Sequence, residues 1–207
     1  MAKCPLCDRR ASKRLCPAKA VKICPICCGT KREIEIECPS DCAYLKQGRS
    51  HEARQSPSEG STERREFSQQ FRHRFAMVIT ALAQVILEER AENPSLLDSD
   101  VRDALTALQA TVRTLSAGIY YETLPEGRGG AISLYRRLRA FLDEMMQPDP
   151  DQTDSLPPSD APDVLEFIAV SVELHSGGRP KSRRYLDWLS SVAPPPVRAN
   201  PDRPTLG

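Results

Sequence analysis

All eight cysteines of the chain lie within its first 42 residues, and this clustering restricts the fold of that segment more than any other feature. Two pairs stand in Cys-Pro-x-Cys turns, Cys4 to Cys7 and Cys24 to Cys27. A turn of this length points two sulfur atoms at one metal ion, and eight thiolates complete two tetrahedral four-sulfur zinc sites. We therefore predict two zinc ions per chain, bound by Cys4, Cys7, Cys16, Cys24, Cys27, Cys28, Cys38 and Cys42.

The rest of the sequence favours zinc over disulfide bonds. The chain starts with Met-Ala-Lys-Cys-Pro and shows no apolar secretory leader, and its longest dense apolar stretch, 75–87, is too short to span a bilayer. We expect a cytoplasmic protein without a membrane segment, in a reducing environment where clustered cysteines bind metal. An iron–sulfur cluster or a redox disulfide is a less favoured alternative, since the cysteine pairs are widely separated.

The segment 1–47 is predicted to be a small zinc-stabilised α+β finger. It holds too few apolar side chains for a core of its own, and structural zinc can contribute about 10–16 kcal/mol to the folding of such a segment. Residues 21–23 are predicted to form a strand, and the alternation of Glu and Ile over 33–37 predicts that Ile34 and Ile36 face inward while the glutamates face water. The segment 38–42 has the features of a helix start, with Pro39 in the first turn.

Two pairings of the cysteines are compatible with their spacing. In the cross-braced pairing, which we favour, one ion is bound by Cys4, Cys7, Cys24 and Cys27, and the other by Cys16, Cys28, Cys38 and Cys42. In the sequential pairing, one ion is bound by Cys24, Cys27, Cys38 and Cys42, and the other by the remaining four. In both pairings the adjacent Cys27 and Cys28 serve different ions, because consecutive side chains point in different directions.

The order of the cysteine pairs resembles that of the small cross-braced B-box, MYND and HIT fingers. The spacing from Cys4 to Cys27 is close to that of a B-box, whereas Lys19 stands near the place of an expected ligand, and Cys38 and Cys42 replace the closing histidines. The segments 23–32 and 38–45 also look like the start of bacterial proteins that join a zinc finger to a helical domain. Such fingers mostly bind proteins, so the resemblance implies an interaction module over the first quarter of the chain.

Beyond the finger the sequence predicts an all-α bundle of about five helices. Residues 48–62 are polar and predict a linker. Apolar residues at three- and four-residue spacing predict helices within 63–192, at 63–92, from about 98 to before Pro125, at 131–146, at 160–176 and after Pro180. A loop at 147–160 interrupts the bundle, and the proline-rich tail 193–207 is expected to be disordered.

The second predicted helix carries a regular apolar seam. Its members alternate at four and three residues, as in a coiled coil, and they are Val101, Leu105, Leu108, Val112, Leu115 and Ile119. We expect this seam to be buried inside the bundle. The alternative is a homodimer formed through the helical region.

Positive charge is concentrated in the finger. Residues 1–50 carry a formal charge of +6, which favours nucleic acid as a partner, but the thiolates of two zinc sites reduce this charge to about +2. A second basic segment, 179–184, opens the last predicted helix, where backbone amides also favour anions. The candidate anion or nucleic-acid contacts are Arg9, Arg10, Lys13, Arg14, Lys31, Arg32, Arg179, Lys181, Arg183 and Arg184.

The sequence contains none of the serine-hydrolase, zinc-protease, P-loop or dinucleotide-binding motifs that would indicate an enzyme. All-cysteine zinc sites are closed and structural, whereas catalytic sites keep an open position. His51 could replace a cysteine ligand, although a solvated linker histidine is the simpler interpretation. We predict a non-enzymatic zinc protein that binds a protein partner as an adaptor or regulator. The alternative is a nucleic-acid-binding regulator that uses the basic finger and the segment 179–184.

Overall fold

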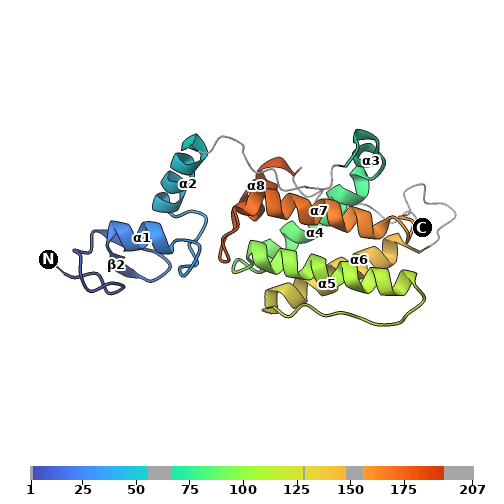
Figure 1. Ribbon diagram of the computed structural model, residues 1–207, viewed down its shortest axis with the longest axis horizontal. Coiled ribbons are helices and arrows are strands. Elements are labelled where there is room, and N and C mark those ends of the chain that lie inside the picture. Colours follow the sequence, from blue (N-terminus) through green and yellow to red (C-terminus); the bar gives the residue numbers. More distant parts are fainter. Residues whose placement is uncertain (1, 56–66, 128, 148–155, 194–207) are drawn as a thin grey trace, which may run out of the picture.

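The computed structural model describes residues 2–55, 67–127, 129–147 and 156–193. Within these residues the chain forms eight helices and one two-stranded sheet. The cysteine-rich segment forms a lobe of its own beside a bundle of helices (Figure 1). Most of the predicted loop 147–160 and of the predicted tail 193–207 lies outside the described residues.

The finger is built from one short hairpin and two helices. Strands β1 (Arg14–Cys16) and β2 (Val21–Ile23) pair antiparallel. Helix α1 (Pro25–Lys31) follows β2, and helix α2 (Ala43–Gln55) ends the lobe. The buried core consists of cysteines and isoleucines, namely Cys4, Cys16, Ile23, Cys24, Cys27 and Ile36. So small an apolar core agrees with the expectation that metal–ligand bonds stabilise this lobe.

Two parts of the finger differ from the sequence prediction. Residues 33–35 form a turn, in which the amides of Glu35 and Ile36 both donate to the carbonyl of Lys31 and Glu33 adopts a left-handed conformation with φ of 56°. Ile34 is therefore exposed and Glu33 is buried, the reverse of what the alternation predicted for them. Helix α2 is the other difference, because it begins at Ala43, after the segment 38–42 that was predicted as its start, and continues to residue 55 through the first part of the segment predicted as a linker.

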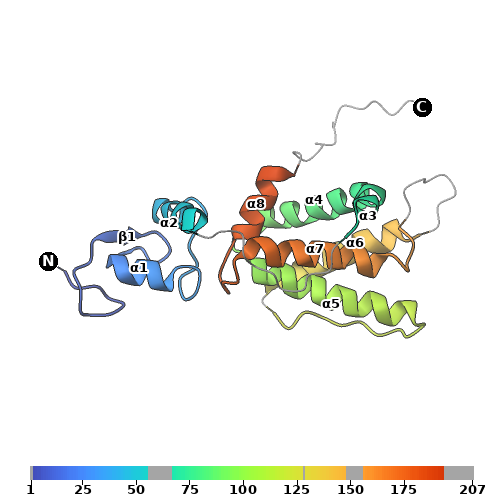
Figure 2. The same cartoon turned by 45° about the horizontal axis from the view of Figure 1, so that its top comes forward.

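Six helices form the bundle in the described part of the chain: α3 (Gln69–Arg74), α4 (Ala76–Glu92), α5 (Asp98–Ser116), α6 (Gly129–Met145), α7 (Ala161–Ser176) and α8 (Arg184–Val192). Helix α5 packs against α6 and α7, and α4 packs against α6 and α8 (Figures 1 and 2). The first predicted helix is split at Phe75, where the backbone leaves helical geometry, and this adds one helix to the five predicted. No helix of the described segments combines the length and apolar character needed to cross a bilayer.

Helix α5 lies at the centre of the bundle core. Its apolar seam is buried from Val101 to Val112 against α6 and α7, as expected for a seam inside a bundle. The helix ends at Ser116, and Gly118 turns the chain with a left-handed φ of 75°. Ile119 therefore lies outside the helix and is 57% exposed, so its place in the predicted seam was wrong.

The start of helix α8 is stabilised by a side chain from α5. The amides of Tyr185 and Leu186 donate hydrogen bonds of 3.1 and 3.2 Å to the carboxylate of Asp98. The amide of Asp98 in turn donates to the carbonyl of Ser182 at 2.9 Å. A buried carboxylate thus satisfies two of the amides that a helix start leaves without a partner, and it fixes α8 to the bundle beside the finger.

Candidate metal centre and the junction beside it

Four cysteine sulfurs from two separate turns lie together in the finger. The Sγ atoms of Cys4, Cys7, Cys24 and Cys27 are all within 4.8 Å of one another. The sulfurs of Cys7 and Cys24 are 3.9 Å apart, and tetrahedral zinc with Zn–S bonds of about 2.3 Å requires sulfurs about 3.8 Å apart. A disulfide would need about 2 Å, and these cysteines are free thiols. The residues present therefore fit a structural metal ion such as zinc.

The first pair of cysteines is presented by a tight turn. The amide of Cys4 donates to the carbonyl of Arg10 at 2.8 Å, and the amide of Asp8 donates to the carbonyl of Cys4 at 2.8 Å. Asp8 reverses the chain with a left-handed φ of 48°. The backbone amides of Arg9 and Arg10 then donate to the sulfur of Cys7, which lowers the pKa of the Cys7 thiol to about 6. The turn therefore favours the thiolate, which is the metal-binding form.

The second pair is presented by the start of helix α1. Cys24 is the N-cap of α1, and its sulfur accepts a hydrogen bond of 3.3 Å from the amide of Cys27. Pro25 occupies the first helical turn, where its missing N–H leaves no bond unmade. The amide of Cys24 donates to the sulfur of Cys4 at 3.2 Å, so a hydrogen bond joins the two turns. Such N–H to sulfur bonds stabilise thiolates and orient them as ligands.

Ionisation of all four sulfurs would require a cation beside them. The side chains of Cys4, Cys24 and Cys27 are buried, and burial together with the neighbouring sulfurs raises the pKa of Cys27 to about 12. At neutral pH the four sulfurs therefore do not ionise together without a counter-charge, even though the pKa of Cys7 is low. A divalent ion bound by these four residues would supply that charge and displace the remaining thiol protons.

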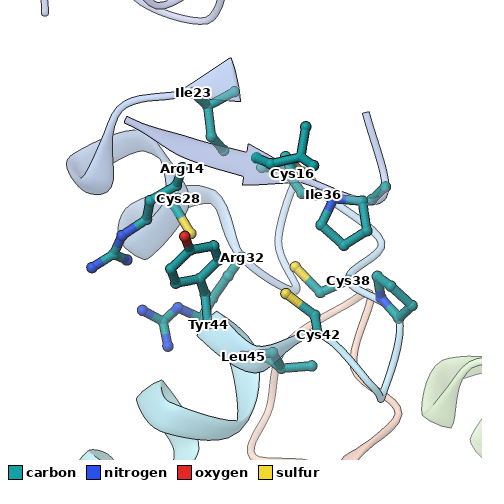
Figure 3. A pocket seen from close by; sticks show the side chains of 14 residues that line it. Arg14, Cys16, Ile23, Cys28, Arg32, Ile36, Cys38, Cys42, Tyr44 and Leu45 are labelled. Carbon is teal, nitrogen blue, oxygen red and sulfur yellow. The ribbon is translucent and has the colours of Figure 1, made fainter. Parts of the chain in front are cut away.

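The other four cysteines line a second, largely enclosed cavity in the finger (Figure 3). They are Cys16, Cys28, Cys38 and Cys42. The cavity measures about 10 Å³, which is room for about one water-sized body. Burial and the nearby sulfurs of Cys42 and Cys16 raise the pKa of Cys38. Among the described residues, however, only the first four sulfurs lie close enough together to form a ready four-ligand group.

This arrangement distinguishes the two pairings of the cysteines. The two Cys-Pro-x-Cys turns share one group, as the cross-braced pairing predicts, whereas the sequential pairing would place Cys24 and Cys27 with Cys38 and Cys42. The neighbouring cysteines of α1 also separate as expected. Cys27 belongs to the four-sulfur group and Cys28 lines the second cavity.

The basic segment 179–184 lies against the finger. The amide of Lys181 donates to the carbonyl of Glu33 at 2.8 Å. Arg179 pairs with Glu33 at 3.1 Å and with Glu52 of α2 at 2.8 Å, and Arg184 pairs with Glu52 at 2.7 Å. These cations, predicted as candidate nucleic-acid contacts, are thus ion-paired within the chain. A nucleic-acid role for them stays a prediction, and a phosphate would have to compete with the finger's carboxylates.

Arg183 links the second set of cysteines to the bundle. Its guanidinium donates to the carbonyl of Cys38 at 3.3 Å and, on the bundle side, to the carbonyls of Leu96 and Ser95 at 3.1 Å each. The Arg183 side chain is buried. The loop that carries Cys38 is therefore held by a residue of the helical bundle.

Glu33 is the central acid of this junction and is only 1% exposed. Its carboxylate pairs with Arg49 of α2 at 2.5 Å as well as with Arg179. Arg49 also pairs with Asp187 of α8 at 2.6 Å, and Arg90 of α4 pairs with the same aspartate at 2.5 Å. Burial of Glu33 is tolerated because cations from other elements supply the missing counter-charge. The sequence did not reveal this role, because the alternation of glutamate and isoleucine predicted that Glu33 faces water.

The predicted basic residues of the finger have different surroundings. The side chains of Arg9, Arg10 and Lys13 are exposed. Lys31 pairs with Glu35 at 2.5 Å. The remaining two, Arg14 and Arg32, line a common pocket beside α2.

The fold and the four-sulfur group define a zinc-finger-like lobe joined to a helical bundle. Comparison of the chain with protein-family models, with curated proteins and with solved structures gave no match. The four-sulfur group is consistent with a zinc-finger-like site, and the resemblance to B-box, MYND and HIT fingers stays a prediction from the order of the cysteines.

Proposed function

We propose that the chain is a zinc-stabilised, non-catalytic adaptor or regulator that binds a protein partner through its finger. The observation that carries this proposal is the largely buried four-sulfur group, which fixes a small hairpin, helix α1 and the turn after it, whose outer side chains include exposed apolar residues. These are Leu15, Val21, Ile26 and Ile34, which are between 41% and 59% exposed. Apolar side chains presented on a rigid frame favour contact with another protein.

The proposal includes two zinc ions per chain. The second would be bound by Cys16, Cys28, Cys38 and Cys42, because these four thiols surround one cavity of about the size of an ion. Both sites would be all-sulfur and closed, so the zinc would cross-link the finger rather than activate a substrate. A reducing compartment such as the cytoplasm belongs to this proposal, since the ligands must remain free thiolates.

Two measurements test the function. The first is recovery of a partner from the native host on immobilised full-length chain, with Leu15→Asp and Ile26→Asp together as the disrupting variant and Met77→Asp as the control. Met77 is exposed on the bundle, so its substitution changes charge and polarity away from the finger. We expect a partner that is retained by wild type and by the control and lost from the finger variant. Retention by all three proteins would contradict the role given to the finger.

The second measurement addresses nucleic acid. Binding of mixed-sequence DNA and RNA fragments to the zinc-loaded chain is measured from low to physiological salt. We expect no saturable binding at low salt. Binding that weakens steeply as salt rises would replace the adaptor proposal with the nucleic-acid alternative, because phosphate contacts release counterions.

A further inference from the structure

An open pocket lies between the hairpin and helix α2, outside the four-sulfur group. It has a volume of about 300 Å³ and is lined by Arg14, Arg32, Tyr44, Gln47, Gly48, His51 and Glu52. Five of these residues come from one stretch of α2, at the spacing that places side chains on one helix face. The two arginines come from β1 and from the residue after α1, and their guanidinium groups extend in the same direction beside the Tyr44 ring (Figure 3).

One buried nitrogen of the Arg32 guanidinium, the Nη1 atom, has no hydrogen-bond acceptor among the described residues. This nitrogen lies 1.2 Å from where a Cβ on Gly48 would stand, so a side chain at position 48 would displace the guanidinium from its present position. Buried charged donors are almost always hydrogen-bonded, because removing them from water is otherwise costly. Arg32, which lines the pocket, therefore carries a buried cationic donor for which the described residues supply no acceptor.

The pocket also carries positive charge that its own carboxylate does not balance. Arg14 lies over the Tyr44 ring, with its guanidinium carbon 4.8 Å from the ring centre, and a stacked guanidinium keeps its N–H edge available. The lining carboxylate of Glu52 is already paired with Arg179 and Arg184. Arg14 and Arg32 thus contribute two charges to a concave surface with a tyrosine hydroxyl beside them.

We propose that this pocket binds a phosphate group, either free or carried by a small molecule. Two guanidinium groups match the oxygens of phosphate in geometry, and a phosphate monoester near −2 matches their combined charge. A volume of about 300 Å³ is at the lower end of small-molecule sites. A phosphate oxygen would supply the acceptor that Arg32 lacks once the guanidinium turns away from Gly48 toward the pocket.

The test is an NMR titration of the zinc-loaded, ¹⁵N-labelled full chain. Inorganic phosphate and adenosine 5′-monophosphate are added separately at constant ionic strength, with sodium chloride as the reference salt. We expect saturable shifts at the amides of Arg32 and Gly48 with at least one probe. Tighter binding of the monophosphate indicates a small phosphorylated molecule, and equal or tighter binding of phosphate indicates the free ion. Shifts with neither probe, or shifts spread evenly over the basic residues of the finger, overturn the proposal.

Three variants make the test specific. Arg14→Gln and Arg32→Gln each should weaken phosphate binding about tenfold or more, because each removes charged hydrogen bonds. Lys22→Gln removes one charge from an exposed position of β2 outside the pocket and should leave the affinity within about twofold. Zinc content and the helical circular dichroism signal establish that each variant is folded. If only one of the two arginine variants is folded, that variant is enough for the test. Unchanged binding in both arginine variants, or equal loss in Lys22→Gln, overturns the proposal and leaves the arginines as counter-charges for nearby thiolates.

Discussion

The backbone amide of Lys181 donates a hydrogen bond of 2.8 Å to the carbonyl of Glu33, and this bond joins the loop before α8 to the cysteine-rich finger. The Glu33 carboxylate is held between Arg49 and Arg179 at the same place. Because Arg183 also donates to the carbonyl of Cys38, the loop that leads to the last two cysteines is attached to the bundle at both ends. Folding of the finger and its docking are therefore expected to be coupled.

Removal of the Glu33 charge should weaken this junction strongly. Glu33→Gln leaves two partly buried guanidinium groups without their shared carboxylate, and we expect a loss of about 3 kcal/mol in the free energy of unfolding. The measurement is urea unfolding of the zinc-loaded chain, monitored through the release of zinc. Glu35→Gln is the matched control, because Glu35 is exposed and its pairing with Lys31 should be worth less than about 1 kcal/mol. Equal effects of the two substitutions would show that the junction does not stabilise the finger.

Acidification should weaken the contact of Glu52 with the bundle. Burial raises the pKa of Glu52, but hydrogen bonds and charges from Arg179 and Arg184 outweigh this effect and hold the pKa below its ordinary value. A carboxyl group with a lowered folded pKa contributes stability that is present above its unfolded value of about 4.3 and is lost as the pH falls through the folded pKa. The stability difference between wild type and Glu52→Gln should therefore be constant from about pH 8 to about pH 5 and decrease below about pH 4.

Urea unfolding of both proteins over this pH range checks the expectation. Loss of zinc in acid affects both proteins, so the difference between them isolates the carboxylate. Glu126→Gln, at an exposed position in the chain segment between α5 and α6, is the control and should show no such difference. A stability difference between wild type and Glu52→Gln that stays constant below pH 4 would contradict the ion pairs assigned to Glu52.

Asp98 should be important for helix α8 although it belongs to α5. Asp98→Ala removes the acceptor of two α8 amides, and we expect a destabilisation of about 1–2 kcal/mol, as for the loss of an N-cap. The one tryptophan of the chain, Trp188, lies in α8, so its fluorescence reports on this helix directly. Asp103→Ala, at a partly exposed position of the same helix α5, should change neither stability nor fluorescence appreciably. A change of fluorescence in both variants would contradict the capping role.

The zinc content of single-cysteine variants should separate the two proposed sites. We expect two zinc ions in wild type and one each in Cys7→Ser and Cys42→Ser, measured by elemental analysis of the purified chain. The helical signal of the bundle should be largely retained in both. One zinc in wild type, unchanged in Cys42→Ser, would remove the second site and leave the first.

Features that depend on neighbouring residues could be predicted from the sequence. The two Cys-Pro-x-Cys turns form as expected, because proline and the short spacing act locally. Strand β2 and helix α7 also match their predictions, and α7 ends at Gly177 with the left-handed φ of 70° that glycine tolerates. The α5 seam is buried up to the point where Gly118 turns the chain.

Features that depend on distant residues could not be predicted in this way. Glu33 alternates with isoleucine, and its burial becomes favourable because Arg49, 16 positions later, and Arg179, 146 positions later, both pair with its carboxylate. The contact with Arg179 makes the basic segment 179–184 part of an internal junction, which its sequence did not indicate, and the nucleic-acid role of this segment stays a prediction. Helix α2 continues through polar residues because Arg49 and Glu52 on it have partners in the bundle. Periodicity alone holds no information on such partners.

The separation of Cys27 and Cys28 on helix α1 limits how this protein can change length over evolution. Each residue of an α-helix rotates the following side chains by about 100°. An insertion or deletion between Cys24 and Cys28 would therefore misdirect the thiols of both clusters in a single event. Homologous chains should tolerate length variation in the turn between β1 and β2 and keep the stretch from 24 to 28 invariant in length.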